Sequence, residues 1–121
     1  MTPATQPSSV ITVLGAGSWG TALALHAARR GLTTRLWTRS AEHFAAMQHD
    51  RRNRRYLPDF AFPENLTAVT DYAQALRGAD LVILAFPSHA LRTALVDVRE
   101  VLAELSRDGD EPHPLYLVAA K

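Results

Sequence analysis

The stretch Val10-Ile11-Thr12-Val13-Leu14-Gly15-Ala16-Gly17-Ser18-Trp19-Gly20 decides the fold of this chain. Its first five residues are apolar or β-branched, which is typical of a strand buried on both faces of a parallel sheet. A Gly-x-Gly-x-x-Gly turn follows, and an alanine-rich segment then continues to Gly31. A strand, a glycine turn and a helix in this order predict a pyrophosphate-binding turn. In such a turn Gly15 allows the tight bend, Gly17 admits the phosphates and Gly20 lets the helix pack on the strand.

The composition is that of one ordinary globular domain. The 121 residues are 47% hydrophobic and carry a net charge of +1, so bulk charge gives no argument for a nucleic-acid or membrane partner. The absence of cysteine excludes disulfides and fits a cytoplasmic protein. Residues 1–9 are short and polar, which predicts a disordered lead-in and not a secretory signal. No apolar run reaches the length needed to cross a membrane.

Apolar and amphipathic segments alternate along the chain. Further strands are expected over 33–38, 66–69, 81–86 and 115–120. Helices are expected over 18–30, 41–49, 71–77 and 88–106, with Ser18, Ser40 and Thr70 or Asp71 as N-caps of the first three. The last helix carries an apolar stripe of Leu91, Leu95, Val98, Leu102 and Leu105. This alternation predicts a Rossmann-like α/β domain over 10–121, a doubly wound parallel sheet in a three-layer αβα arrangement.

The segment 50–65 breaks the alternation. It holds two prolines and four arginines, and we expect a functional loop because loops of this length are uncommon inside compact domains. Its arginines either steer a phosphorylated ligand or form a solvated surface, and the second interpretation is favoured. None of the five histidines has metal-ligand spacing with a further partner, so no metal site is predicted.

Ligands of doubly wound sheets bind beyond the carboxyl ends of the strands. At these carboxyl ends, Pro87 follows the strand expected over 81–86, and Arg39 follows the strand expected over 33–38. NAD-specific sites place Asp or Glu about twenty residues past the glycines, whereas Thr38 and Arg39 occupy that place here. A guanidinium favours a 2′-phosphate, so the sequence favours NADP(H), with NAD(H) as the alternative cofactor. The competing interpretation of Arg39 is a solvated surface residue, and Trp37 is expected to pack in the core.

Several stretches resemble the N-terminal, cofactor-binding domain of bacterial NAD(P)-dependent glycerol-3-phosphate dehydrogenases. They are Val13 to Ala24, Leu36-Trp37-Thr38-Arg39, Asn53 with Tyr56-Leu57-Pro58, Phe86-Pro87-Ser88 with Arg92, and Val118-Ala119-Ala120-Lys121. With the resemblance included, the predicted cofactor contacts are Gly15, Gly17, Ser18, Trp19, Gly20, Arg39, Tyr56, Pro87 and Lys121. The resemblance implies that Lys121 also contacts the substrate. It implies no catalytic residue in this chain, because the acid–base lysine is expected in a second, helical domain that the chain lacks.

The resemblance implies reversible reduction of dihydroxyacetone phosphate to sn-glycerol 3-phosphate for phospholipid synthesis, with this truncated chain inactive by itself. The resemblance is compatible with a homodimer. Two other interpretations stay open. One is another two-domain dehydrogenase, of the 6-phosphogluconate or hydroxyacyl-CoA type, against which Tyr56-Leu57-Pro58 argues. The other is a stand-alone NAD(P)-sensing regulatory module, against which the end of the chain directly after a buried strand argues.

Overall fold

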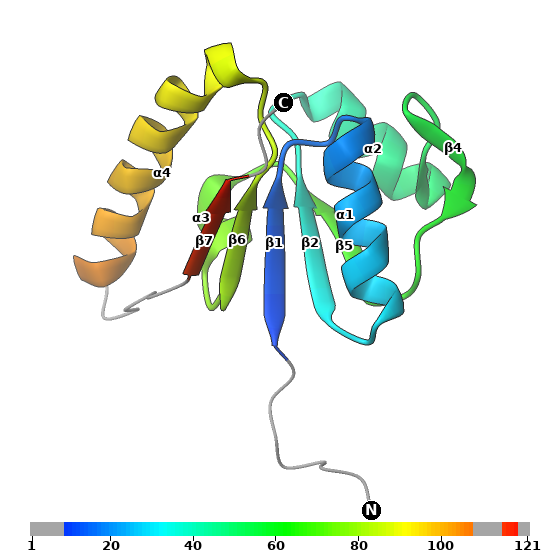
Figure 1. Cartoon of the computed structure of the whole chain (residues 1–121), viewed down its shortest axis with the longest axis horizontal. Helices are drawn as coiled ribbons and strands as arrows, with labels where there is room; N and C mark the ends of the chain where they lie inside the picture. The colour runs from blue at the N-terminus through cyan, green and yellow to red at the C-terminus, as the bar shows by residue number, and fades with distance from the viewer. Residues whose placement is uncertain (1–8, 108–114, 119–121) are drawn as a thin grey trace, which may run out of the picture.

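The computed structural model describes residues 9–107 and 115–118 and contains a five-stranded parallel sheet between helices (Figure 1). Its strands are β1 (Val10–Leu14), β2 (Thr33–Trp37), β5 (Leu66–Val69), β6 (Leu81–Leu84) and β7 (Leu115–Val118). The order across the sheet is β5-β2-β1-β6-β7. The chain therefore moves outward from β1 in one direction and then returns to add β6 and β7 on the other side. This order confirms the predicted Rossmann-like, doubly wound fold.

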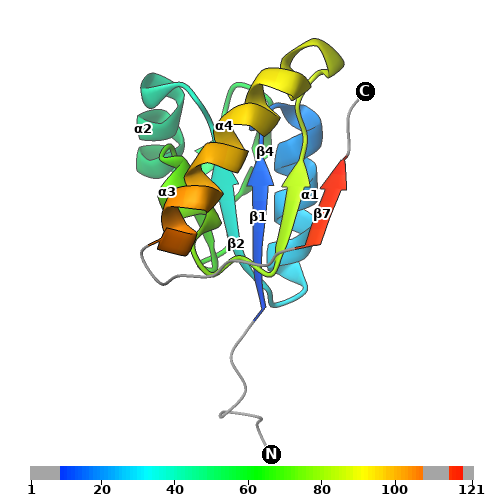
Figure 2. The same cartoon turned by 90° about the vertical axis from the view of Figure 1, so that its left-hand side faces the viewer.

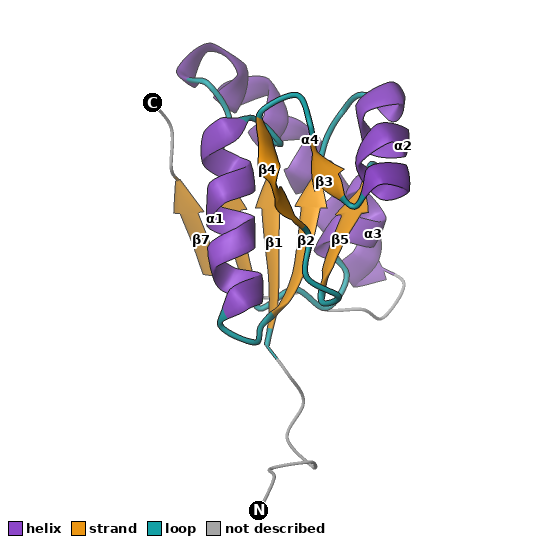
Figure 3. Ribbon diagram, turned by 90° about the vertical axis from the view of Figure 1, so that its right-hand side faces the viewer, coloured by secondary structure: helices purple, strands orange, loops and turns teal. Residues whose placement is uncertain are grey.

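Helices cover both faces of the sheet. They are α1 (Ser18–Arg29), α2 (Ala41–Asp50), α3 (Tyr72–Leu76) and α4 (Ser88–Arg107). Figure 2 shows α4 crossing in front of the sheet, and Figure 3 shows α1 in front of it from the opposite side. Val13 packs into the core cluster of the α1 face and Leu14 into the cluster of the α3 and α4 face. Both faces of β1 are thus buried, which explains its continuous apolar run.

The segment 50–65 is not the loop that the sequence predicts. It contains a small antiparallel hairpin of β3 (Arg52–Asn53) and β4 (Leu57–Ala61). Arg51, with a left-handed φ of 52°, ends α2 and turns the chain into the hairpin. Phe62 then anchors the hairpin in the core of the α1 face. The two strands of this hairpin show no alternation of apolar and polar residues, because β3 has only two residues and β4 is largely exposed.

The arginines of this segment hold the hairpin together. Arg51 donates to the carbonyl of Pro63 at 2.7 Å, and Arg52 donates to that of Pro58 at 2.7 Å. Arg54 pairs with Asp50 at 3.0 Å on the exposed surface. These contacts give three of the four arginines a structural partner; Arg54 and Arg55 are exposed, whereas Arg51 and Arg52 are half-buried and not fully solvated.

Two further sequence predictions are wrong in detail. Gly17 is the N-cap of α1 in place of Ser18, which is the first helical residue and makes no capping bond. Leu95 is 40% exposed and does not belong to the buried stripe of α4. The buried residues of that helix include Ala94, which packs in the core cluster of the α3 and α4 face. The predicted caps of α2 and α3 are confirmed, with Ser40 and Asp71 as the capping residues.

The register of the sheet brings three chain segments to one edge. Leu14 pairs with Trp37 on one side and with Leu84 on the other. Directly beyond these pairs, the N–H of Gly15 donates to Trp37 O at 3.0 Å and that of Ala85 donates to Leu14 O at 2.9 Å. The glycine turn and the ends of β2 and β6 therefore lie side by side, where β1 separates the two halves of the sheet. Among the described residues, no helix is long and apolar enough to span a membrane.

Candidate cofactor-binding site

The three glycines of the turn have different physical reasons to lack a side chain. Gly15 has a φ of +119°, and a Cβ there would lie 2.6 Å from the carbonyl oxygen of Ala85. A Cβ on Gly20 would overlap the carbonyl oxygen of Gly15. Gly17 has an ordinary φ of −78°, and a Cβ there would meet no atom within 4 Å. The fold itself requires Gly15 and Gly20, whereas Gly17 borders open space of the kind that a closely approaching pyrophosphate needs.

The N-terminus of α1 is left without a side-chain cap. Ser40 caps α2 by accepting from His43 N at 3.1 Å, and Asp71 caps α3 by accepting from Ala73 N at 3.2 Å. No described side chain does this for α1, whose first internal bond runs from Thr21 N to Gly17 O. The preceding amides of the first turn therefore lack an intrahelical acceptor. Together with the partial positive charge of a helix start, they suit a phosphate.

Two adjoining cavities lie at this edge of the sheet. The first has a volume of about 440 Å³ and is bounded by the glycine turn, Trp19, Tyr56 and residues 85–87. The second, of about 280 Å³, is bounded by the ends of β2 and β6 and by Arg39. Gly15, Ala16 and Phe86 line both cavities. The two cavities adjoin at the switch point of the sheet, which is where dinucleotides bind in sheets of this order.

An aromatic cluster supports the second cavity. Trp37 is buried, as predicted, and stacks on Tyr72 with ring centroids 4.3 Å apart. Phe86 meets Trp37 edge to face at 5.7 Å. Burial raises the pKa of the Tyr72 hydroxyl, which lies near the Arg39 guanidinium. The indole nitrogen of Trp37 makes no hydrogen bond within the described part of the chain, so the three rings are held together by packing.

The structure brings most of the predicted site residues together. Seven line the first cavity, namely Gly15, Gly17, Ser18, Trp19, Gly20, Tyr56 and Pro87. Arg39 is exposed at the mouth of the second. Lys121 lies outside the described residues. Within residues 9–107 and 115–118, no group of three or more His, Asp or Glu side chains could hold a metal ion.

Sequence reasoning missed the role of Asn53. This residue is quoted only as part of the resemblance, yet its side chain is fully buried and bonds to the glycine turn. A lone asparagine among four arginines carries no local signal of burial. Its partner Ala16 lies 37 positions away in the sequence.

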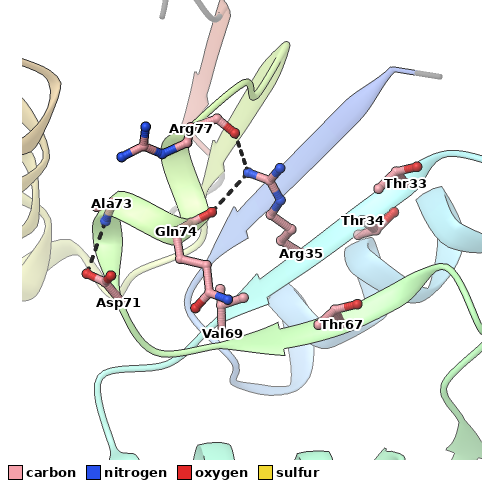
Figure 4. A pocket seen from close by; sticks show the side chains of 9 residues that line it. All are labelled: Thr33, Thr34, Arg35, Thr67, Val69, Asp71, Ala73, Gln74 and Arg77. Carbon is pink, nitrogen blue, oxygen red and sulfur yellow. Dashed lines mark hydrogen bonds between the residues drawn. The ribbon is translucent and has the colours of Figure 1, made fainter. Parts of the chain in front are cut away.

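Another cavity among the described residues lies away from this edge of the sheet and has a structural explanation. It measures about 510 Å³ and is bounded by β2, β5 and α3 (Figure 4). Arg35 enters it, and its Nη1 donates to the carbonyls of Gln74, Ala75 and Arg77 at 2.6–3.0 Å. These carbonyls lie at the end of α3 and lack helical partners. Arg35 therefore closes a short helix, and burial lowers its pKa from the usual value.

Comparisons with known proteins agree with this geometry. The family model for the N-terminus of NAD-dependent glycerol-3-phosphate dehydrogenase matches residues 10–109. Glycerol-3-phosphate dehydrogenase [NAD(P)+] of Halorhodospira halophila is 53% identical over 85 residues, which are 70% of this chain and 26% of that protein. The enzyme of the same name from Neisseria gonorrhoeae is 43% identical over 111 residues, which are 92% of this chain and 31% of that protein.

Solved structures give the same result. The crystal structure of glycerol-3-phosphate dehydrogenase from Coxiella burnetii has a TM-score of 0.74 and 36% identity, and the match covers 94% of this chain and 33% of that one. A diketoreductase at 20% identity, with a TM-score of 0.63, shares the fold alone. The chain thus spans about a quarter to a third of the length of the relatives that it matches. It belongs to the family of N-terminal domains of NAD-dependent glycerol-3-phosphate dehydrogenases.

Proposed function

We propose that this chain is the NAD(P)-binding domain of a glycerol-3-phosphate dehydrogenase, which reversibly reduces dihydroxyacetone phosphate to sn-glycerol 3-phosphate for phospholipid synthesis. One observation carries the proposal. The first turn of α1 has no side-chain cap and opens beside Gly17 into a cavity of about 440 Å³. When bound, the nicotinamide would supply or accept the hydride. The residues of this chain bind and orient the dinucleotide.

The proposed contacts follow from the placement of each residue. The amides of Gly17, Ser18 and Trp19 receive the pyrophosphate, while Gly15 and Gly20 give the turn its shape. Tyr56 and Pro87 form walls of the same cavity. Lys121 is proposed, from the resemblance alone, to contact both cofactor and substrate.

We assign the preference for NADP(H) to Arg39. It follows β2 at the place where NAD-specific domains carry a carboxylate, and its guanidinium is exposed beside the second cavity. A 2′-phosphate there would gain a charge-assisted bond that a 2′-hydroxyl cannot match. NAD(H) would bind through the same turn, only more weakly.

The test is a titration of the 121-residue chain with NADPH and with NADH. Replacement Arg39→Ala is expected to weaken NADPH binding by about tenfold, the worth of one charge-assisted bond, and to leave NADH binding unchanged. Arg30→Ala is the matched control, because Arg30 is also exposed but lies at the opposite end of α1. An equal loss of both cofactors, or no change, would contradict the role of Arg39.

Catalysis is proposed to need the part of the polypeptide that the longer relatives possess beyond this stretch. We place the acid–base lysine and most contacts to dihydroxyacetone phosphate in that second domain. The 121-residue chain is therefore expected to bind cofactor without turnover, and measurable oxidation of sn-glycerol 3-phosphate by it would contradict this division. A regulatory NAD(P) sensor would bind tightly but would stay inactive in the longer polypeptide too. A cytoplasmic location and a homodimer complete the proposal.

A further inference from the structure

Asn53 connects three parts of the candidate site through one buried amide. Its side chain is 0% exposed. Nδ2 donates to the carbonyl of Ala16 at 3.0 Å and to Oγ1 of Thr21 at 2.8 Å. Oδ1 meets Nε2 of His43 at 3.0 Å. These partners belong to the glycine turn, to α1 and to α2.

The partners fix the direction of each bond. A carbonyl only accepts, so the nitrogen of the Asn53 amide must face Ala16. The oxygen then faces His43, whose Nε2 must carry the hydrogen. Both hydrogens of Nδ2 are used, and the buried amide is fully satisfied as a donor. It can therefore hold one orientation without leaving a donor unpaired in the core.

The bond to Ala16 controls a peptide plane inside the turn. Gly15 and Gly17 flank this residue and lack the Cβ that restricts backbone rotation. The carbonyl of Ala16 and the N–H of Gly17 belong to one planar trans unit and point in opposite directions. Because Asn53 holds the carbonyl toward the core, it turns the Gly17 N–H away from the core. Gly17 itself lines the 440 Å³ cavity.

The same network reaches the other predicted contacts. The carbonyl of Asn53 accepts from Tyr56 N at 3.3 Å, which ties the Tyr56 turn to the same residue. The ring of Tyr56 lies 5.8 Å from that of His43. Nδ1 of His43 lies 3.4 Å from Oγ1 of Thr38, directly before Arg39. Asn53 is thus joined to the turn, to the Tyr56 wall and to the end of β2.

We propose that Asn53 is a positioning residue for the cofactor pyrophosphate: its buried amide locks the Ala16–Gly17 peptide so that the Gly17 N–H stays available to a phosphate. This role rests on the proposed binding of NAD(P)(H). It predicts that loss of the amide weakens the pyrophosphate contact specifically and leaves the 2′-phosphate contact in place.

The main test compares two buried substitutions in the 121-residue chain. Asn53→Leu removes all three bonds, whereas Thr21→Val removes one acceptor of the same amide and leaves the bond to Ala16. Asn53→Leu is expected to raise the Kd for NADPH by about tenfold or more, the worth of one misdirected charge-assisted bond. Thr21→Val is expected to change it less than threefold, about the effect of a weak neutral contact.

A phosphorus NMR spectrum of bound NADP+ separates positioning from general loosening. At saturation, the pyrophosphate signals of Asn53→Leu are expected to differ from those of the wild type, while the 2′-phosphate signal stays in place. If Asn53→Leu does not fold, Asn53→Asp replaces it in the binding titration and in the NMR measurement. The carboxylate keeps an acceptor for His43 and loses both N–H donors. The Thr21 hydroxyl can donate to it in the reverse direction, whereas the Ala16 carbonyl has no hydrogen to offer and loses its partner.

The outcomes are distinct. A wild-type chain that binds neither NADPH nor NADP+ overturns the proposed function and this inference with it. A wild type that binds, with Asn53 variants that match Thr21→Val in affinity and spectrum, overturns the positioning role alone. Equal changes of both phosphate signals also overturn it, because they indicate a general structural defect.

Discussion

The three glycines of the turn should respond differently to the same small substitution. A methyl group at Gly17 meets no described atom within 4 Å beyond its two chain neighbours and causes no backbone strain at a φ of −78°. Alanine is a poorer N-cap than glycine by about 0.5–1 kcal/mol. It also restricts the unfolded chain, which returns about 0.4–1 kcal/mol. The free energy of unfolding of Gly17→Ala should therefore stay within about 1 kcal/mol of the wild-type value.

Gly20→Ala should instead destabilise the fold. Alanine within the helix gains about 1 kcal/mol in propensity. Its Cβ, however, overlaps the carbonyl oxygen of Gly15 and lies 3.2 Å from the Cβ of Ala85. The obstructing atom is backbone and cannot rotate away, so we take the upper end of overpacking costs, about 3 kcal/mol. The net loss is about 2 kcal/mol.

Two measurements on the same samples test this reasoning. Urea unfolding followed by circular dichroism gives the stability. Energy transfer from tryptophan to bound NADPH gives the affinity, since Trp19 is exposed beside the cavity. Gly17→Ala should lose about 10- to 100-fold in affinity, because the methyl displaces the pyrophosphate from one or two charge-assisted bonds. Wild-type affinity in Gly17→Ala, or wild-type stability in Gly20→Ala, would refute the assignment of these roles.

Two more predictions concern stability. Ser40→Ala should lower the free energy of unfolding by about 1 kcal/mol through loss of the α2 cap, whereas Ser18→Ala should leave it nearly unchanged because Ser18 caps nothing; urea titration measures both, and equal losses would contradict the cap assignment. Burial raises the pKa of Tyr72, so the wild type should lose stability as the pH rises above about 10, where the unfolded tyrosine ionises first. Denaturant titrations at several pH values between about 8 and 11 should show a smaller loss of unfolding free energy for Tyr72→Phe than for the wild type. Equal losses in the two proteins would contradict this role of Tyr72.

The parts of the fold that the sequence predicts are those with a dense local pattern. The strand over 10–14 is apolar throughout because helices cover both of its faces. The helix from Ser88 is equally clear from its periodicity. Periodicity places Leu95 in the stripe, four positions after Leu91, and gives no signal that Ala94 is buried in its place. Ala94 packs in the core cluster of the α3 and α4 face, together with Val98 and Leu105.

The hairpin could not be predicted because its contacts lie outside any hydrophobic pattern. Strand β4 is mostly exposed, and the pair is held by guanidinium groups that bond to the carbonyls of Pro58 and Pro63. Phe62 supplies the apolar anchor from beyond the end of β4. In a sequence, proline and arginine indicate a surface loop as readily as a hairpin of this kind. Only the position of the Pro58 and Pro63 carbonyls in the folded chain distinguishes the hairpin from a loop.

The candidate site was predicted better than the hairpin because it is built from backbone. A phosphate cradle needs a bend, a bare Cα and a helix start, and all three are encoded within the short stretch Gly15 to Gly20. The group that holds the cradle in place is a side chain from another part of the fold, 37 positions from its partner Ala16. Asn53 therefore leaves no local signature beside the motif that it supports. A search for site residues that stops at the glycine motif finds the groups that we propose to touch the cofactor and misses the one that we propose to orient them.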